Sequence, residues 1–317
     1  MHQVMPRTPG RPAPRPSRRF VLTAAGSVAL GAVAAGCGPR DSGLSAPAST
    51  AEASTIPRDG ALSAPEPSAA PGAAVPASRS EIERRFAGRP PGRWGLDLPG
   101  ITTHTGTHAV ALTFDACGGP GGSGYDSRLI DLLRRLRVPA TLFLNARWTS
   151  ANPSLSRELA SDPLFEIGNH GLAHLPLSTT GRSAYGIAGT RSVDAVIDEV
   201  SGGASAIIAL TGKRPPWFRP GTAFYDETAV QVVAAMALCP LSFSVNSDGG
   251  ATFPPRTVAA QLGTVRPGDI VIGHLNQPRS GTSAGYAAAL PALIDQGLDF
   301  TTLSQARAPI PSRPEFD

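Results

Sequence analysis

The feature that most restricts the fold of this chain is a regular alternation of short apolar, β-rich runs with longer amphipathic runs, beginning at His108. The leucine-rich stripe between Asp126 and Leu136 predicts a helix that Asp126 can cap. Strands separated by helices favour parallel βαβ units, so we expect an α/β fold of about seven parallel strands, closed as a barrel or wound as an open sheet. The expected strands are His108–Phe114, Ala140–Asn145, Phe165–Gly168, Trp217–Arg219, Leu241–Val245, Asp269–Gly273 and Phe300–Leu303. The expected later helices are Pro153–Ala160, Val193–Leu210, Asp226–Ala237, Pro255–Leu262 and Ala287–Gln296.

Polar side chains of the types found in active sites follow five of these predicted strands. They are Asp115, His170, Arg219, Asp248 and His274. In a barrel, the loops at the carboxyl ends of the strands converge on one face, which is where catalytic groups lie. One such residue would be a weak sign, but five at separate strand ends predict a common site.

The clearest candidate metal ligands are His170 and His174, which follow a predicted strand and are separated by three residues. On one helical turn this spacing places both imidazoles on the same face, as a shared divalent metal requires. His104 and His108 have the same spacing but lie across a glycine-containing turn and a strand start. We interpret that second pair as structural.

The first predicted strand ends in the segment TFDACGG, which places Asp115 before a glycine-rich loop. With the histidine pair, this segment resembles the polysaccharide deacetylases of carbohydrate esterase family 4, which share the NodB-homology domain. The resemblance spans roughly residues 106–306. The matching segments, in order, are Thr113–Cys117, His170 with His174, Phe218–Thr222, Asn246–Asp248 and Ile272–His274.

The resemblance implies a distorted (β/α) barrel that removes acetyl groups from N-acetylated sugars with the help of a divalent metal, zinc being favoured. By this resemblance Asp115 is the base, and His274, oriented by Asp248, protonates the departing amine. A backbone N–H near Thr222 would stabilise the oxyanion. The candidate catalytic residues are Asp115, Arg219, Asp248 and His274, the candidate metal ligands are His170 and His174, and Thr222 and Asn169 are candidates for oxyanion or substrate contacts.

The chain departs from the family pattern at the second residue of its first motif, where an aspartate metal ligand is replaced by Ala116. Two neutral imidazoles hold a divalent ion less tightly than a site with an added anion. Candidate replacements are Asp115, Asp126, the thiolate of Cys117, or water. Cys117 is also a candidate for a disulfide with Cys239, whose geometry cannot be read from sequence.

The N-terminus has the features of an export signal. The segment Ser17–Leu22 resembles a twin-arginine signal, and the apolar run from Phe20 to Ala35 is shorter than the ~20 residues of a membrane-spanning helix. Small residues before Cys37 resemble a bacterial lipoprotein cleavage site, with Ala34 where a large aliphatic residue is usual. We expect residues 1–36 to direct export and Cys37 to carry a lipid. A cut nearby that releases a free protein is the alternative.

The rest of the chain divides by composition. Residues 37–80 are rich in Ala, Pro and Ser and predict a disordered linker that holds a domain away from a membrane or wall. Residues 81–105 predict a short helix and an irregular extension, 106–306 the catalytic domain and 307–317 a tail. We expect a monomer in the cell envelope or outside the cell, acting on a polysaccharide or peptidoglycan-like substrate.

The charge distribution argues against nucleic acid as a partner. The formal charge is +4, but residues 1–36 contain five arginines and no acid, which leaves 23 bases against 24 acids in the remainder. A nucleic-acid-binding face needs clustered Lys and Arg, and no basic run follows the leader.

Two other functions remain open from the sequence. The loss of a ligand at Ala116 favours an inactive relative that binds glycan strands, whereas Asp115 and His274 argue for catalysis. A hydrolase of the same fold that cuts another non-peptide C–N bond, in an imide or a small amide, is the third reading.

Overall fold

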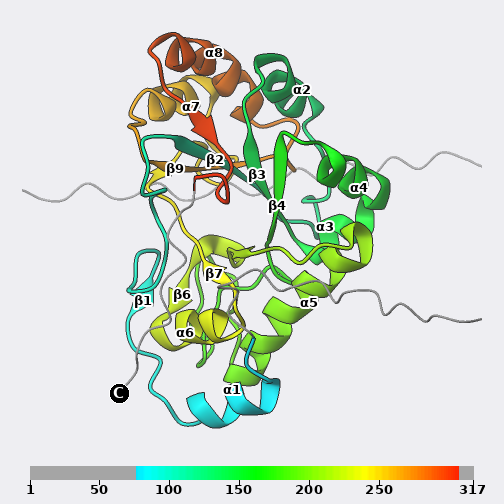
Figure 1. The fold of residues 1–317 in the computed structure, drawn as a ribbon, viewed down its shortest axis with the longest axis vertical. Helices are drawn as coiled ribbons and strands as arrows, with labels where there is room; N and C mark the ends of the chain where they lie inside the picture. The colour runs from blue at the N-terminus through cyan, green and yellow to red at the C-terminus, as the bar shows by residue number, and fades with distance from the viewer. Residues whose placement is uncertain (1–75, 307–317) are drawn as a thin grey trace, which may run out of the picture. The chain divides into compact units, whose positions relative to one another are not determined.

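The computed structural model describes residues 76–306, and its centre is a sheet of eight strands whose pairings are all parallel. Seven of them follow the order β7-β5-β4-β3-β2-β9-β8, and β10 pairs with the first residues of β2 (Figure 1). The expected α/β barrel of parallel strands is confirmed, with one strand more than predicted. The strands are β2 (Val110–Ala116), β3 (Ala140–Leu144), β4 (Phe165–Asn169), β5 (Trp217–Phe218), β7 (Cys239–Pro240), β8 (Val245–Asn246), β9 (Ile270–His274) and β10 (Phe300–Thr301).

The additional strand arises because the predicted strand Leu241–Val245 is divided between the two ends of the sheet. The backbone N–H of Leu241 still donates to Phe218 in β5, whereas that of Ser244 donates to Ile270 in β9. The five residues from the end of β7 to the start of β8 can span at most ~18 Å. The sheet must therefore curl until its two ends lie close together, which gives the distorted barrel.

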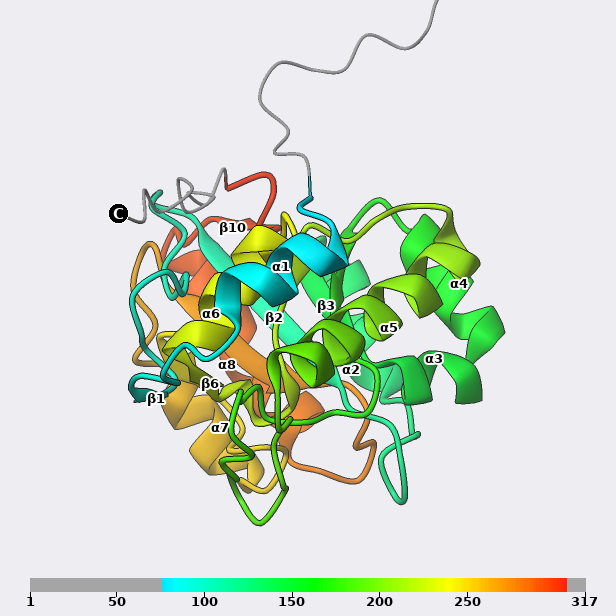
Figure 2. The same ribbon diagram turned by 90° about the horizontal axis from the view of Figure 1, so that it is seen from below.

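Helices cover the outside of the curled sheet (Figures 1 and 2). Alternate residues of β2 divide between two apolar clusters, because successive side chains of a strand point to opposite faces. Leu112, Phe114 and Ala116 pack in the outer cluster with α2, α7 and α8, while Ala111 joins the inner one. The helices are α1 (Arg79–Phe86), α2 (Ser127–Leu136), α3 (Ala146–Ala151), α4 (Pro153–Ser161), α5 (Val193–Thr211), α6 (Glu227–Ala235), α7 (Pro255–Leu262) and α8 (Thr282–Asp295), with a 3₁₀ turn η1 (Gly221–Ala223).

Several helix boundaries differ from the sequence prediction. Helix α3 was not expected, and its start is fixed by Asn145, whose side-chain oxygen accepts from the N–H of Arg147. Helix α8 begins five residues before the predicted start at Ala287 and contains Pro291. Its first turn carries Thr282, which takes part in the candidate site described below.

The N-terminal extension is more ordered than expected. Helix α1 begins two residues inside the segment predicted as linker, and Ile82 and Phe86 are buried against the domain. A short strand, β1 (Trp94–Gly95), then pairs antiparallel with β6 (Tyr225–Asp226). The extension is therefore partly a packed element of the barrel.

The remaining predictions for the two ends fall on residues that the structure does not describe. The export signal, the lipid attachment at Cys37, residues 37–75 of the linker and the tail 307–317 lie outside the described residues. Within residues 76–306, no helix combines the length and the apolar character that crossing a membrane requires.

Helix α5 packs closely on the loop that follows β4, and its glycine pair makes this approach possible. A Cβ at Gly203 would lie 2.2 Å from Oδ1 of Asn169 and 2.7 Å from the backbone of Gly171. A Cβ at Gly202 would meet only the side chain of Leu172, at 2.8 Å or more. The contacts at Gly203 include backbone atoms of Gly171, which move only if the loop moves, whereas two of the three nearest atoms at Gly202 are the methyl groups of Leu172, which can rotate away.

We predict that Gly203→Ala lowers the free energy of unfolding by about 1–3 kcal/mol, because overpacking outweighs the gain in helix propensity. Gly202→Ala is the matched control, with the same gain in propensity and a movable neighbour. Chemical denaturation of both variants measures the difference. Equal stabilities for the two variants would contradict the assigned packing of α5.

Candidate active site

The central interaction of the site is a buried ion pair between Asp115, at the end of β2, and Arg219, after β5. Nη1 of Arg219 donates to Oδ1 of Asp115 at 2.8 Å, and Nη2 donates to Thr113 and to the carbonyl of Ser242. Both charged residues are almost completely buried. Burial acts to raise the pKa of Asp115, but the charges of His170, Arg219 and His274 outweigh it and lower the pKa. Asp115 is therefore ionised at neutral pH.

His170 follows β4 and lies beside this pair, with Nε2 3.5 Å from Oδ2 of Asp115. Its Nδ1 lies 2.8 Å from the backbone carbonyl of Arg219, an acceptor, so Nδ1 carries the proton. Burial acts to lower the pKa of His170, but the Asp115 carboxylate and Cys117, which Nε2 faces, outweigh it and raise the pKa. A metal bound there would take the place of a proton on this nitrogen. A backbone carbonyl thus fixes the orientation of the His170 imidazole.

His174 reaches the same place by a route that the sequence analysis did not predict. Residues 170–174 form a loop and not a helical turn, with positive φ at Gly171 (81°) and His174 (62°). The expected helical face is therefore wrong, yet the two imidazole centroids lie 4.8 Å apart. The loop reverses the direction of the chain between His170 and His174, and this reversal brings the two rings together without a helical turn.

Glu199 in α5, which the sequence analysis missed, holds this loop in place. Its nearly buried carboxylate accepts hydrogen bonds from the backbone N–H groups of Ala173 and Leu175. A Cβ at Gly171 would lie 2.3 Å from the same carboxylate. The only signal in the sequence was an acid among the apolar residues of a predicted helix. Its partners are backbone groups, which a side-chain pattern does not reveal.

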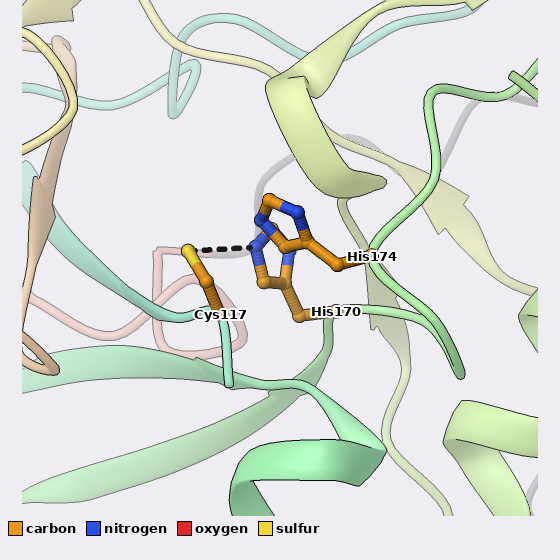
Figure 3. Close-up of side chains that lie close together, drawn as sticks. All are labelled: Cys117, His170 and His174. Atoms are coloured by element: carbon orange, nitrogen blue, oxygen red, sulfur yellow. Dashed lines mark hydrogen bonds between the residues drawn. The ribbon is translucent and has the colours of Figure 1, made fainter. Parts of the chain in front are cut away.

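Cys117 completes a group of three potential metal ligands with the two histidines (Figure 3). Sγ lies 3.8 Å from Nε2 of His170, and the three ligand atoms lie within 4.8 Å of one another. Burial acts to raise the pKa of the Cys117 thiol, but hydrogen bonds with His170, His174 and His274 bring the pKa well below its usual value. A thiolate and two imidazoles form a borderline-soft set that fits zinc and similar transition metals.

The alternation of β2 explains why residue 117 and not residue 116 faces the two histidines. Ala116 belongs to the outer apolar cluster, whereas Thr113 and Asp115 point toward Arg219. Cys117 is two residues after Asp115 and lies on the same side. This periodicity was present in the sequence, but the sequence analysis did not use it to choose among the four candidate replacements.

Two other proposals for this region gain no support from the described residues. Asp126 lies at the N-terminus of α2 with one oxygen near Arg128, and neither Asp126 nor Asp115 belongs to the group of described residues whose ligand atoms lie close enough to share an ion with both histidines. Cys117 and Cys239 are both free cysteines, so the predicted alternative of a disulfide between them is wrong.

The two residues expected to contact substrate differ in their surroundings. Asn169 is fully buried, and its side chain bonds to backbone groups of Val200 and Gly171, so it shapes the loop and is not placed to touch a substrate. Thr222 lies in η1 with φ of 72°. A Cβ on the preceding residue, Gly221, would lie 2.2 Å from the carbonyl oxygen of His174, so this turn is directly beside the histidine loop.

His274 and Asp248 form the second charged pair of the site, as the sequence analysis expected from their positions. Asp248 Oδ1 lies 3.0 Å from Nδ1 of His274, while Oδ2 accepts from the N–H of His274 and from Thr282. Burial acts to lower the pKa of His274, but the Asp248 carboxylate outweighs it, and the pKa lies well above its usual value. His274 therefore holds a proton at neutral pH, and Thr282 is a further positioning residue that the sequence did not reveal.

A curled parallel sheet with these ionisable groups at the carboxyl ends of its strands defines the class of α/β barrel whose site lies on that face. Residues 102–240 match the family model described as polysaccharide deacetylase. A chitooligosaccharide deacetylase from Sinorhizobium fredii is 27% identical over 213 residues, which cover 63% of this chain and 93% of that protein. A peptidoglycan-N-acetylglucosamine deacetylase from Bacillus cereus is 27% identical over 200 residues, which cover 62% of this chain and 86% of that protein. These matches support a polysaccharide deacetylase domain in this chain.

A solved structure supports the same fold. A pseudoenzyme of carbohydrate esterase family 4 from Bacillus anthracis superposes with a TM-score of 0.55 at 23% identity, covering 66% of this chain and 70% of that one. The likeness confirms the distorted barrel. The chain spans between 53% and 93% of the length of the first curated relatives that it matches.

We predict that the full chain binds Co²⁺ with a sulfur-to-cobalt charge-transfer band in the near ultraviolet, because Cys117 supplies a thiolate. Cys117→Ser is expected to abolish this band and to weaken metal binding at least about tenfold, since a neutral hydroxyl is a poorer ligand than a thiolate. Absorption titration measures both quantities.

Cys239→Ala is the matched control for this titration, because Cys239 is buried in the inner apolar cluster away from the three ligands. It is expected to keep the band. A band that survives in Cys117→Ser would show that Cys117 is not a ligand.

Proposed function

We propose that this protein is a metal-dependent hydrolase that removes acetyl groups from N-acetylated sugars of a cell-wall or extracellular polysaccharide. The observation that carries the proposal is the ionised Asp115, paired with Arg219 and 3.5 Å from the imidazole of His170. A buried carboxylate next to side chains that can bind a metal is the arrangement needed to activate water.

The chain's own groups supply the base and the acid of amide hydrolysis. Asp115 accepts a proton from the attacking water, and Arg219 keeps the carboxylate ionised and fixed. His274, charged and oriented by Asp248, gives its proton to the amine nitrogen as the C–N bond breaks. The products are acetate and a free amino sugar, so one water is consumed for each acetyl group released.

The metal would be held by His170, His174 and Cys117, and zinc is the ion that this donor set favours. When bound, a divalent ion polarises the substrate carbonyl and lowers the pKa of water. The N–H groups of the turn at Thr222 are the candidate donors to the oxyanion, because this turn lies against the backbone of His174.

The substrate class is inferred from the relatives, whose names specify chitooligosaccharides and peptidoglycan N-acetylglucosamine. Such polymers lie outside the cytoplasm, which agrees with the export signal proposed for residues 1–36 and the lipid anchor proposed at Cys37. We infer that a monomer acts at the cell envelope. The linker would give the barrel reach along its polymeric substrate.

A second candidate is a glycan-binding protein without activity. Ala116 and the fold shared with a family 4 pseudoenzyme favour it. The buried pairs of Asp115 with Arg219 and of Asp248 with His274 favour catalysis, because a binding protein gains nothing from two oppositely charged proton-transfer groups. Hydrolysis of an imide or a small amide by the same groups is the third possibility.

We predict that zinc-loaded protein releases acetate from N-acetylglucosamine oligomers and that Asp115→Asn lowers the rate by about 10²–10⁴, because an amide cannot accept the proton. Asp131→Asn, the same change on the exposed surface of α2, is the control and is expected to keep the wild-type rate. A coupled acetate assay measures all three proteins, and thermal unfolding checks that each is folded.

The three candidate functions give different results in this assay. Equal rates for wild type and Asp115→Asn would remove Asp115 from the mechanism. Polymer binding without acetate release, with any divalent metal, would favour the glycan-binding protein. Hydrolysis restricted to cyclic imides or small amides would favour the third candidate.

A further inference from the structure

Three aromatic side chains form a connected group on a part of the chain that the proposed chemistry does not use. The rings of Trp94 and Phe224 have centroids 5.5 Å apart, and those of Tyr185 and Phe224 lie 5.6 Å apart in an edge-to-face arrangement. Trp94 comes from β1, Phe224 from the residues after η1, and Tyr185 from the connection between β4 and α5. We call these three residues the aromatic platform.

The three segments that carry the aromatic platform are fixed to one another by hydrogen bonds. Strand β1 pairs with β6 directly after Phe224, and the N–H of Leu177 donates to the carbonyl of Phe224. Arg182, three residues before Tyr185, donates to the carbonyl of Gly92, two residues before Trp94. The aromatic platform is therefore a built feature, and the connection that carries Tyr185 projects beyond the helices (Figure 2).

The exposure of Tyr185 is unusual for a large aromatic residue. It is 76% exposed, the highest value among the large apolar side chains of the described residues that are exposed. Its φ is 52°, a conformation that residues with a side chain rarely adopt and that costs free energy. Tyr185 and Gly186 form a two-residue turn closed by hydrogen bonds between Ala184 and Ile187. This turn holds the Tyr185 ring in solvent against Phe224, which is itself partly exposed.

The aromatic platform adjoins the candidate active site along the chain. Phe224 is five residues after Arg219, which bonds to Asp115, and two residues after Thr222, beside the histidine loop. Five residues span at most ~18 Å. A sugar resting on the aromatic platform would therefore lie only a few rings from a sugar whose acetamide is beside Asp115.

We propose that the aromatic platform binds a pyranose ring of the glycan strand at a position next to the sugar that is deacetylated. This inference rests on the proposed function and specifies that the substrate is a polymer and not a monosaccharide. One face of a β-linked pyranose carries only C–H bonds, which pack against aromatic rings, while its hydroxyls stay in water and can reach the Tyr185 hydroxyl.

The charge of the domain favours this occupant. Residues 76–306 contain 19 bases and 18 acids, so the domain has no excess charge with which to attract an ionic polymer. An uncharged, amphipathic ligand with flat apolar faces matches an aromatic surface, and a pyranose is such a ligand.

Tryptophan fluorescence offers a readout of binding that does not depend on activity. The sequence has three tryptophans, and Trp148 and Trp217 are 0% and 2% exposed. Trp94 is only partly buried, so it is the tryptophan whose emission a ligand on the aromatic platform would change. Titration with N-acetylglucosamine pentamer, in the Asp115→Asn background so that the ligand is not consumed, measures the affinity.

We expect a saturable change in Trp94 emission and an affinity for the pentamer that falls about 3- to 10-fold in Tyr185→Ala, the loss of one stacked ring. Tyr185→Phe keeps the ring and is expected to stay within about twofold of the parent. Ile208→Ala removes an exposed apolar side chain from α5 and is the control expected to change nothing. With active protein, Tyr185→Ala is expected to raise KM for the pentamer with little change in kcat, and to leave the monosaccharide unaffected.

The outcomes separate this inference from the proposed function. Acetate release by the wild type without any emission change, or equal affinities of Tyr185→Ala and Ile208→Ala, would contradict glycan binding by the aromatic platform. The proposed hydrolase activity would be unaffected by either result. Pentamer binding that depends on Tyr185 in a protein that releases no acetate would support glycan binding by the aromatic platform. The same result would contradict the proposed hydrolase activity. Equal effects of Tyr185→Ala on pentamer and monosaccharide would also contradict the proposal.

Discussion

The rest of the site depends on the hydrogen bonds of the fully buried Arg219 guanidinium. It bonds to Asp115 and Thr113 in β2 and to the carbonyl of Ser242 in the segment that closes the barrel, and its own carbonyl faces Nδ1 of His170. One residue thereby fixes the Asp115 carboxylate, the orientation of the His170 imidazole and the junction of the two sheet ends. Loss of one partner of a buried ion pair costs about 3–5 kcal/mol, so chemistry and stability are coupled here.

The proposed third metal ligand lies one residue further along the chain than in the family pattern. The family pattern implies an aspartate at residue 116, and this chain has an alanine there that faces the outer apolar cluster. One residue further, Cys117 faces the histidines, and the lowered pKa of its thiol favours a thiolate at this position. If Cys117 is a ligand, as we propose, the exchange of a hard carboxylate for a soft thiolate would shift the preference of the site toward zinc and similar ions. The missing aspartate alone is therefore weak support for an inactive protein.

The sequence allowed the barrel to be predicted because its strands are continuous apolar runs and its helices have apolar stripes, both set by local periodicity. The positions of Asp115, His170, Arg219, Asp248 and His274 followed from the ends of those strands. The division of Leu241–Val245 between two strands could not be predicted, since it depends on where the curled sheet closes. The roles of Glu199 and Asn169 were hidden for a similar reason: their partners are backbone groups of a loop whose path is set by positive φ and not by side-chain pattern.

The central claim is that Cys117, His170 and His174 hold one ion within reach of the Asp115 carboxylate. X-ray absorption of the zinc-loaded full chain tests it most directly, because it identifies the ligand atoms independently of any substrate. The account predicts one sulfur at about 2.3 Å and imidazole nitrogens at about 2.0–2.1 Å from zinc. A shell made only of nitrogen and oxygen, or a spectrum unchanged when both histidines are replaced, would contradict it.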